Sequence, residues 1–277
     1  MRIVFQTVNG VRTRVLFAGD PSAYPILLIH GFGISADTWV RNIDALGKDF
    51  FVVAPDMVGH GFTDPVDFAG DAPHQKTVDH LVSLINLYGF QRLCISGSSY
   101  GALIGALLYL RLPRRVNKLV INGSGSCFNT EEELAVATKG AFENARGVIM
   151  NPTLETCRKR MGNIVYDVAS VPEEVLHVQL TTYAASETVK AWEQAIKGMM
   201  QIEKVRPYRI YERLEDIDVD TLVVWGREDR RGHYARAVEA VKRMPRARLL
   251  TFEKCGHMPF MEHSDLYNHE IKAFLAE

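Results

Sequence analysis

Ser99 is the residue whose surroundings most directly indicate chemistry. It is the centre of residues 97–101, Gly-Ser-Ser-Tyr-Gly, which have the form G-x-S-x-G and lie between an apolar run and a helix-forming run. At a strand-to-helix junction this motif forms a nucleophile elbow, a turn sharp enough to expose the serine hydroxyl. The glycines permit that turn because they lack a Cβ. The alternative is a glycine-rich turn in which the serine is incidental.

A serine hydroxyl acts as a nucleophile at neutral pH only with a neighbouring base, which a third group orients. With an elbow of this kind, the partners follow in the chain order serine, acid, histidine. Downstream of Ser99, one apolar run leads into Glu228 and Asp229, and the next leads into His257. Loops that follow parallel strands meet at one edge of a sheet, so these side chains are expected beside Ser99. Either acid fits from spacing alone.

The other histidines fit the role of the base less well. Of the nine in the chain, only His257 combines the expected order with a position in a loop after a strand. His60 lies between two glycines and is interpreted as a turn residue. The remaining candidates precede the serine or are interpreted as helix or cap residues: His74, His80, His177, His233 and His269.

Two backbone amides are candidates for an oxyanion hole, whose N–H donors must face the charge that develops on the substrate. One donor normally belongs to the residue after the nucleophile, here Tyr100. The second is expected from residues 30–33, His-Gly-Phe-Gly, where glycines let the backbone bend inward and Phe32 supplies the N–H.

The elements that position these residues follow an alternating pattern. Asn9-Gly10 is a strong hairpin signal between expected strands at 2–8 and 11–17. Apolar runs of strand length follow at 25–30, 50–54, 93–95, 119–121, 222–225 and 249–252. Helices are expected at 36–46, 75–88, 100–110, 233–244 and 264–275. Strands alternating with helices predict an α/β fold with a mostly parallel sheet.

Residues 128–206 interrupt this alternation because they contain no convincing strand. Helical patterns cover 131–144, 153–164, 172–185 and 187–202. Glu131-Glu132-Glu133 and Pro172-Glu173-Glu174 are helix-start signatures. A helical block that enters after the elbow, at the carboxyl ends of the strands, is expected to act as a cap over the site. The alternative is a structural elaboration without function.

Composition excludes several classes of partner. The chain has 277 residues and a formal net charge of −1, so nucleic acid and anionic membranes are not expected partners. No apolar run approaches the roughly 20 residues that span a bilayer, and no signal peptide is evident. The four cysteines are too scattered for a zinc site and too few for a disulfide scaffold. We expect a cytoplasmic protein that acts on a small molecule without a metal or other cofactor.

Together these motifs resemble the α/β-hydrolase superfamily over essentially the whole chain. The turn at His30-Gly31, the elbow, Trp225-Gly226-x-x-Asp229 and Gly256-His257 occur in the family's order. The resemblance implies Asp229 rather than Glu228 as the acid. It also implies an α/β-hydrolase core formed by residues 1–127 and 207–277, with a helical cap at 128–206. The serine at the elbow disfavours dehalogenases and epoxide hydrolases, whose nucleophile is a carboxylate.

A closer likeness is to the meta-cleavage product hydrolases, bacterial enzymes that break a carbon–carbon bond in ring-opened aromatic catabolites. Residues 54–64, 165–176 and 254–257 look like theirs. The chain departs from that family before the nucleophile, in a cap helix and after the histidine, where it has Ser98, Gln179 and Met258 in place of asparagine, arginine and tryptophan.

These departures mark Ser98, Gln179 and Met258 as candidate substrate-pocket residues. Replacing a guanidinium by the amide of Gln179 removes a bidentate contact to an anion. A substrate carboxylate would then need another partner, such as Arg158 or Arg160.

The sequence therefore predicts a serine hydrolase in which Ser99, His257 and Asp229 form the triad. Aromatic and sulfur side chains such as Phe32 and Met258 favour a small, largely apolar substrate, either an ester or a ketone whose carbon–carbon bond is cleaved. A cofactor-free lyase or cyclase with the same triad and a non-catalytic ligand-binding protein are the alternatives. Assembly as a homodimer is implied by the resemblance alone.

Overall fold

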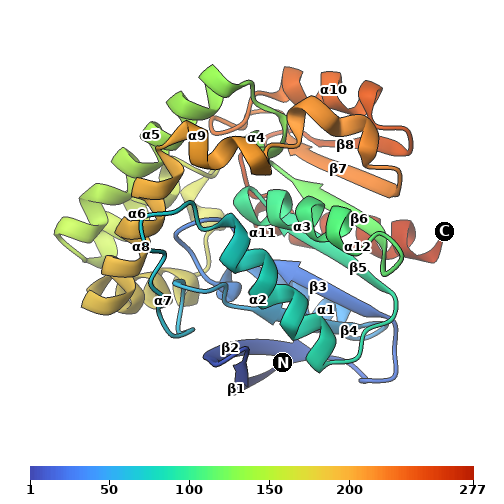
Figure 1. Cartoon of the computed structure of the whole chain (residues 1–277), viewed down its shortest axis with the longest axis horizontal. Helices are drawn as coiled ribbons and strands as arrows, with labels where there is room; N and C mark the ends of the chain where they lie inside the picture. Colours follow the sequence, from blue (N-terminus) through green and yellow to red (C-terminus); the bar gives the residue numbers. More distant parts are fainter.

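A computed structural model describes residues 1–277 and contains one eight-stranded sheet (Figure 1). The strands are β1 (Arg2–Val8), β2 (Val11–Ala18), β3 (Pro25–Ile29), β4 (Phe51–Pro55), β5 (Leu93–Ser98), β6 (Val116–Asn122), β7 (Asp220–Gly226) and β8 (Ala247–Phe252). Their spatial order is β1-β2-β4-β3-β5-β6-β7-β8. β1 and β2 are antiparallel to their neighbours, and every pair from β4 to β8 is parallel. The predicted, mostly parallel sheet is confirmed.

The opening hairpin follows from its turn residues. Asn9 and Gly10 both have positive φ, 49° and 79°, as a type I′ turn requires. Val8 therefore pairs directly with Val11, and the two strands continue in register from that pair.

Helices cover both faces of the sheet. One layer contains α2 (His74–Leu87), α3 (Tyr100–Arg111) and α10 (Tyr234–Arg243), and the other contains α1 (Val40–Leu46), α11 (Pro259–Glu262) and α12 (Ser264–Ala276). In Figure 1, α2 and α3 lie in front of the sheet and α1 and α12 behind it. Along β3, Leu27 and Ile29 pack into the first layer, and Ile26 and Leu28 into the second. Burial on both faces explains why these strands are continuous apolar runs.

Between β6 and β7 the chain forms only helices. They are α4 (Gly125–Phe128), α5 (Glu131–Met150), α6 (Leu154–Gly162), α7 (Glu173–Ala184), α8 (Ser186–Met199) and α9 (Ile202–Val205). We call residues 128–206 the helical insert. Its main helices α5–α8 lie together beyond one end of the strands, at the left of Figure 1. α5 begins as predicted, with a capping box between Thr130 and Glu133, and continues to Met150.

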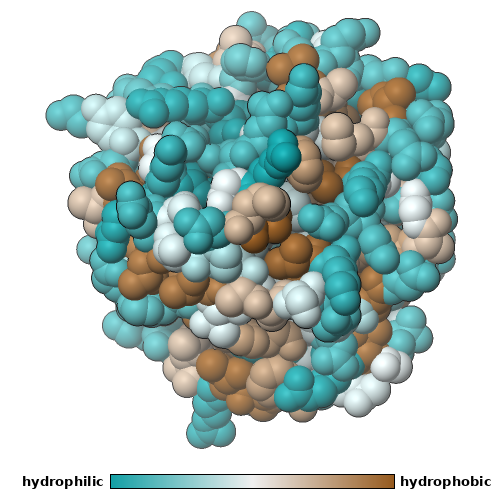
Figure 2. All heavy atoms as spheres, turned by 90° about the vertical axis from the view of Figure 1, so that its left-hand side faces the viewer, coloured by the Kyte–Doolittle hydropathy of each residue, from teal (hydrophilic) through white to brown (hydrophobic).

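The helical insert shares its core with the rest of the molecule. Met161 and Leu176 of the insert belong to the same buried cluster as Trp39 and Phe260, which lie under the sheet. Figure 2 looks onto the insert and shows apolar patches near the centre and lower part of a mainly hydrophilic face. No helix in the structure combines the length and apolar character that crossing a membrane requires.

Candidate active site

Ser99 occupies a strained turn between β5 and α3. Its backbone has φ 53° and ψ −118°, a left-handed conformation that costs a non-glycine residue about 1–3 kcal/mol. A Cβ on Gly97 would lie 2.3 Å from the carbonyl oxygen of Gly101, and a Cβ on Gly101 would lie 2.3 Å from that of His30. Both glycines of the motif are therefore needed for the close approach of β3, β5 and α3.

The end of β6 holds this turn in place. The Ser99 N–H donates to the Asn122 carbonyl oxygen at 2.8 Å, and the Ser124 hydroxyl donates to the Ser99 carbonyl oxygen at 2.7 Å. The side chain of Asn122 also donates to the Gly97 carbonyl oxygen at 2.8 Å. Sequence reasoning missed these two supports. Asn122 and Ser124 could have been found from their position at the end of a parallel strand, at the same sheet edge as Ser99.

His257 lies against Asp229 rather than Glu228. The distance from His257 Nδ1 to Asp229 Oδ2 is 2.8 Å, and the Asp229 side chain is fully buried. The other carboxylate oxygen of Asp229 accepts the N–H groups of Arg231 at 2.7 Å and Gly232 at 3.1 Å. Because Asp229 occupies Nδ1, Nε2 is the ring nitrogen left for the cavity. Glu228 instead accepts the Cys255 N–H at 2.9 Å.

Glu262 shapes the loop that carries His257. Its carboxylate accepts the N–H groups of Gly256, at 3.0 and 3.1 Å, and of Tyr166, at 2.6 Å. The His257 N–H donates to the carbonyl oxygen of Ile164 at 3.0 Å. Because Ile164 and Tyr166 belong to the helical insert, the insert is joined directly to the histidine loop. The sequence did not identify Glu262, although it stands only five residues after His257.

Two adjoining cavities, with empty volumes of about 560 and 570 Å³, meet at Ser99. Both are lined by Phe32, Ser99, Ala141, Arg231 and His257. The first, which we call the apolar lobe, continues along Tyr100, Gly125, Ser126, Leu134, Ala137, Thr138, Ile196 and Met199. The second, the arginine lobe, continues along Gly31, Ile34, Ser98, Asn144, Arg160, Ile164, Trp192 and Met258.

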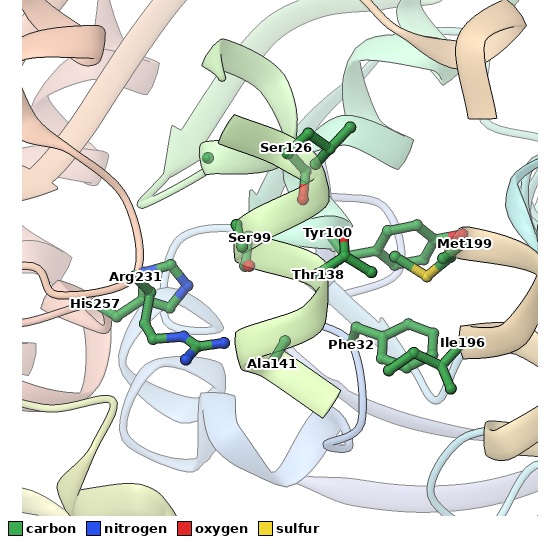
Figure 3. Close-up of a pocket in the computed structure, with 13 residues that line it drawn as sticks. Phe32, Ser99, Tyr100, Ser126, Thr138, Ala141, Ile196, Met199, Arg231 and His257 are labelled. Atoms are coloured by element: carbon green, nitrogen blue, oxygen red, sulfur yellow. The ribbon is translucent and has the colours of Figure 1, made fainter. Parts of the chain in front are cut away.

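Figure 3 shows how the labelled residues are arranged around Ser99. Phe32, Ile196 and Met199 gather on one side, and His257 and Arg231 lie on the other. No hydrogen bond joins Ser99 to His257 in this structure, although both side chains line both lobes. Such catalytic hydrogen bonds often tighten only when substrate is bound.

The two predicted oxyanion donors lie beside Ser99. A Cβ on Gly31 would be 3.5 Å from the Ser99 Cβ, so the loop carrying Phe32 passes next to the nucleophile. The Phe32 N–H makes no backbone hydrogen bond. Tyr100 is the first residue of α3, where an N–H has no partner within the helix. Neither amide is therefore committed to a backbone acceptor.

The candidate pocket residues fall in different places. Ser98 and Met258 line the arginine lobe. Gln179 lines neither lobe: its side chain is buried and donates to the sulfur of Met161 at 3.1 Å, because this face of α7 packs against α6. Of the two arginines considered from the sequence, Arg158 forms an exposed ion pair on the insert surface, and Arg160 lines the arginine lobe.

The chain offers no evident metal site. No group of three or more histidine, cysteine, aspartate or glutamate side chains is placed to hold a metal ion. All four cysteines are buried and free.

His30, at the start of the oxyanion loop, is held as a neutral ring. Its Nδ1–H donates to the Gly31 carbonyl oxygen at 2.7 Å, and its Nε2 accepts the Met57 N–H at 3.0 Å. Burial, followed by the charge of His60, lowers the pKa of His30 to about 3. Protonation would set a second N–H against that of Met57, so this contact depends on the neutral ring.

The protein is therefore expected to lose stability already between pH 7 and pH 5, above the pH range in which carboxylates titrate. Burial lowers the pKa of His30 and His74 to about 3 and of His60 and His80 to about 4. As pH falls below about 6.5, the ordinary pKa of histidine, these side chains bind protons in the unfolded chain but not in the native state. Each histidine then lowers the free energy of unfolding by up to about 1.4 kcal/mol per pH unit.

Urea unfolding at pH 7, 6 and 5 tests this prediction. Burial raises the pKa of Asp56 to about 6, so this carboxyl binds a proton in the native state first and adds stability as pH falls. The four histidines together outweigh this single group. His80→Gln should make the pH dependence shallower by about one proton, whereas the exposed His177→Gln should leave it unchanged. Equal slopes for the wild type and His80→Gln would contradict the assignment.

Comparison with known proteins identifies relatives along nearly the whole chain. A family described as the alpha/beta hydrolase family matches residues 26–270. A 2-hydroxy-6-oxononadienedioate/2-hydroxy-6-oxononatrienedioate hydrolase of Paraburkholderia phymatum is 28% identical and covers 91% of this chain and 87% of its own. A 2-hydroxymuconate semialdehyde hydrolase of Pseudomonas putida is 27% identical and covers 97% of this chain and 92% of its own.

The fold of this chain is also similar to that of a solved structure. A meta-cleavage product hydrolase from Pseudomonas fluorescens, in complex with acetates, superposes with a TM-score of 0.79 at 26% identity. The match covers 100% of this chain and 97% of that one.

Proposed function

The chain belongs to the alpha/beta hydrolase family, and from its site we propose that it is a serine hydrolase with Ser99 as nucleophile, His257 as base and Asp229 as the residue that orients the base. The observation that carries this proposal is the 2.8 Å contact between His257 Nδ1 and Asp229 Oδ2 beside a serine in a strained elbow. This contact fixes the tautomer in which Nε2 can take a proton.

The reaction that these residues support has two halves. In the first, Ser99 Oγ attacks the substrate carbonyl carbon while His257 Nε2 takes the hydroxyl proton, and the Phe32 and Tyr100 amides receive the oxyanion. The tetrahedral intermediate then collapses, and the leaving group takes the proton from His257. In the second half, His257 takes a proton from water, which attacks the acyl group on Ser99. The resulting intermediate collapses, His257 returns the proton to Ser99 Oγ, and the acid is released.

For the substrate we propose a ketone of the ring-opened aromatic catabolite type, as the names of the relatives suggest. The leaving group is then a carbanion, whose charge is spread over a conjugated dienoate until the imidazolium of His257 protonates it. The helical insert would act as a lid, because α5, α6 and α8 supply Ala141, Arg160 and Trp192 to the cavity walls. A closed lid excludes water until the first half of the reaction is complete.

Purified protein mixed with a coloured 2-hydroxy-6-oxodienoate is expected to bleach it, because cleavage of the carbon–carbon bond ends the conjugation. Mass spectrometry should detect two products. In water enriched in ¹⁸O, the carboxylic acid formed from the ketone carbonyl should carry one labelled oxygen.

Other results would identify the alternatives. Rapid cleavage of p-nitrophenyl esters without bleaching would favour an esterase. A single product of unchanged mass would indicate a lyase or cyclase, and tight binding without any product would indicate a ligand-binding protein. Any of these three outcomes contradicts the carbon–carbon assignment.

A further inference from the structure

A third, smaller cavity continues the apolar lobe away from Ser99. Its empty volume is about 290 Å³, and it shares five lining residues with that lobe: Tyr100, Ser126, Leu134, Thr138 and Met199. Ser99 and His257 line the apolar lobe but not this cavity, so the cavity lies at the far end of the lobe. We call it the distal pocket. In Figure 3 the Tyr100 ring lies beside Met199, on the side away from His257.

Two buried aromatic rings at the distal pocket carry polar atoms without partners. His74, the first residue of α2, and Tyr100, the first residue of α3, are each only 1% exposed. Their rings meet edge to face, with centroids 5.2 Å apart. His74 Nδ1 and the Tyr100 hydroxyl oxygen are both buried without a hydrogen-bond partner. Because buried polar groups are normally hydrogen-bonded, this end of the lobe lacks a polar group that a ligand could supply.

Neighbouring side chains do not satisfy these two atoms. Tyr208 stacks on the His74 ring, with centroids 4.9 Å apart and planes 4° apart, so it contacts the face of the imidazole. The Thr77 hydroxyl lies near Tyr100, but it already donates to the Pro73 carbonyl oxygen at 2.8 Å. Thr77 can therefore only accept from Tyr100, and the tyrosine oxygen still lacks a donor.

The distal pocket carries no net charge. Burial lowers the pKa of His74 to about 3, so the imidazole is neutral and has one donor and one acceptor nitrogen. Arg209 lines the pocket, but its guanidinium donates twice to Glu212, at 3.0 and 2.5 Å. No acidic side chain lines the pocket. A neutral polar group is therefore favoured over an ion, which would lose its hydration without gaining a counter-charge.

We propose that the distal pocket binds a hydroxyl group at the far end of the substrate's acyl part, with His74 and Tyr100 as its hydrogen-bond partners. This inference rests on the proposed hydrolase function, since it places the scissile carbonyl at Ser99. It revises the sequence-based expectation of a largely apolar substrate. The hydrocarbon of the acyl part contacts Leu134 and Met199, and its polar end faces the two rings.

A hydroxyl is the group that meets both needs of the distal pocket with a single oxygen. It donates one hydrogen bond, which the Tyr100 oxygen needs, and it accepts another, which the N–H of a neutral imidazole supplies. A ketone or ether oxygen can only accept, so it would leave the Tyr100 oxygen without a donor. Specificity of this kind is strong because the analogue that lacks the hydroxyl leaves buried polar groups unpaired.

Matched aryl ketones test the inference by binding alone. Hydroxyacetophenone and methylacetophenone, each substituted at the meta or the para position, differ only in a hydroxyl against a methyl group of similar size. At pH 6.5, where the phenol is neutral, the wild type should bind the better hydroxy isomer about 5- to 50-fold more tightly than its methyl counterpart. Titration of the thermal unfolding midpoint with each ketone measures these affinities. Equal affinities at both positions would overturn the inference.

Variants that keep the aromatic rings locate the preference. His74→Phe and Tyr100→Phe each remove polar atoms from the distal pocket, and each should reduce the preference for the hydroxy ketone severalfold. Tyr109→Phe is the matched control, because it removes a hydroxyl from the same helix as Tyr100 but lines neither lobe nor the distal pocket. It should keep the full preference.

A merely structural role for the two rings gives a different result. His74→Phe and Tyr100→Phe would then lower the thermal unfolding midpoint and weaken both ketones equally, without changing the ratio of their affinities. A wild-type preference that both variants retain would place the hydroxyl elsewhere and overturn the inference. Because the rings belong to different helices, one variant still tests the inference where the other does not fold.

Turnover separates this inference from the proposed function. A coloured 2-hydroxy-6-oxodienoate with a hydroxyphenyl group on its ketone carbon should have a kcat/KM about 5- to 50-fold above that of the methylphenyl analogue. If neither compound is bleached, the proposed hydrolase function fails, and the ketone affinities still decide whether the distal pocket binds a hydroxyl. If both are bleached with equal kcat/KM and the ketones bind equally, the hydrolase function stands and the distal hydroxyl site is overturned.

Discussion

Ser99→Ala is expected to lower kcat by about 10⁶-fold, the size of effect seen when the nucleophile of a catalytic triad is removed. The fold should be unaffected. Alanine keeps the Cβ of serine, so the backbone strain is the same, and the Ser99 bonds to Asn122 and Ser124 use only its N–H and carbonyl groups. Stopped-flow or steady-state assays that follow bleaching of the coloured dienoate measure kcat. The thermal unfolding midpoint measures whether the fold is unaffected.

Ser83→Ala is a suitable control for that experiment. Ser83 lies on α2, lines neither lobe, and its hydroxyl bonds only to a carbonyl oxygen of its own helix. It should retain full activity. A purified, folded Ser99→Ala protein that still turns over substrate at the wild-type rate would show that Ser99 is not the nucleophile.

Asp229→Asn is expected to lower kcat by about 10⁴-fold with little change in KM. The N–H groups of Arg231 and Gly232 both donate to one oxygen of Asp229, so the asparagine must keep its carbonyl oxygen there. Its NH₂ group then faces His257 Nδ1 and can only donate. His257 is forced to carry its proton on Nε2, where it can no longer accept one from Ser99.

Glu228→Gln provides the matched comparison at the neighbouring acid. Glu228 accepts one backbone N–H, from Cys255, and the amide oxygen of glutamine can accept the same bond. We expect near wild-type kinetics from this variant. The opposite pattern, with Glu228→Gln inactive and Asp229→Asn active, would reverse the assignment of the acid.

Most of the fold could be predicted because its signals are local. Asn9-Gly10 specifies one turn type, and burial on both faces requires a parallel strand to be apolar throughout, so a short window of sequence is enough. Acidic residues in the first turn predict the start of α5 at Glu131, and Pro172-Glu173-Glu174 predicts a start at residue 172, one residue before α7 begins. The predicted helix ends agree less well with the structure: α5 continues past residue 144 to Met150, and Pro152 follows directly after its end.

The placement of the candidate triad at one cavity could also be predicted, since Ser99, Asp229 and His257 each follow a strand that the sequence marks clearly. The walls of the cavity could be predicted only in part: Ser98 and Met258 line it, whereas Gln179 does not. Register from Tyr166 and Asp167 placed Gln179 in the pocket, but the rotation of α7 is set by its packing on α6, which sequence period alone does not determine. Such packing depends on contacts between two helices, which the pattern of one helix does not show.

Arg231 is the converse case, a residue that lines the cavity but that the sequence did not identify. In the sequence it ends a short basic cluster at 227–231, a pattern typical of a solvated surface loop. Its inward direction follows from the tight turn in which Asp229 accepts the N–H groups of Arg231 and Gly232. That turn could be recognised only once the partner of Asp229 was known.

The position of the helical insert also has a consequence for biosynthesis. β6 ends at Asn122, and its parallel partner β7 begins at Asp220, so residues 123–219 are made before the pair can form. At about 5–20 residues per second, this segment occupies the ribosome for on the order of 5–20 s. Throughout that time β6, whose residues are almost all buried in the finished protein, presents an unpaired apolar edge to which another nascent chain could bind. The length of the insert therefore sets how long this edge waits for its partner strand during synthesis.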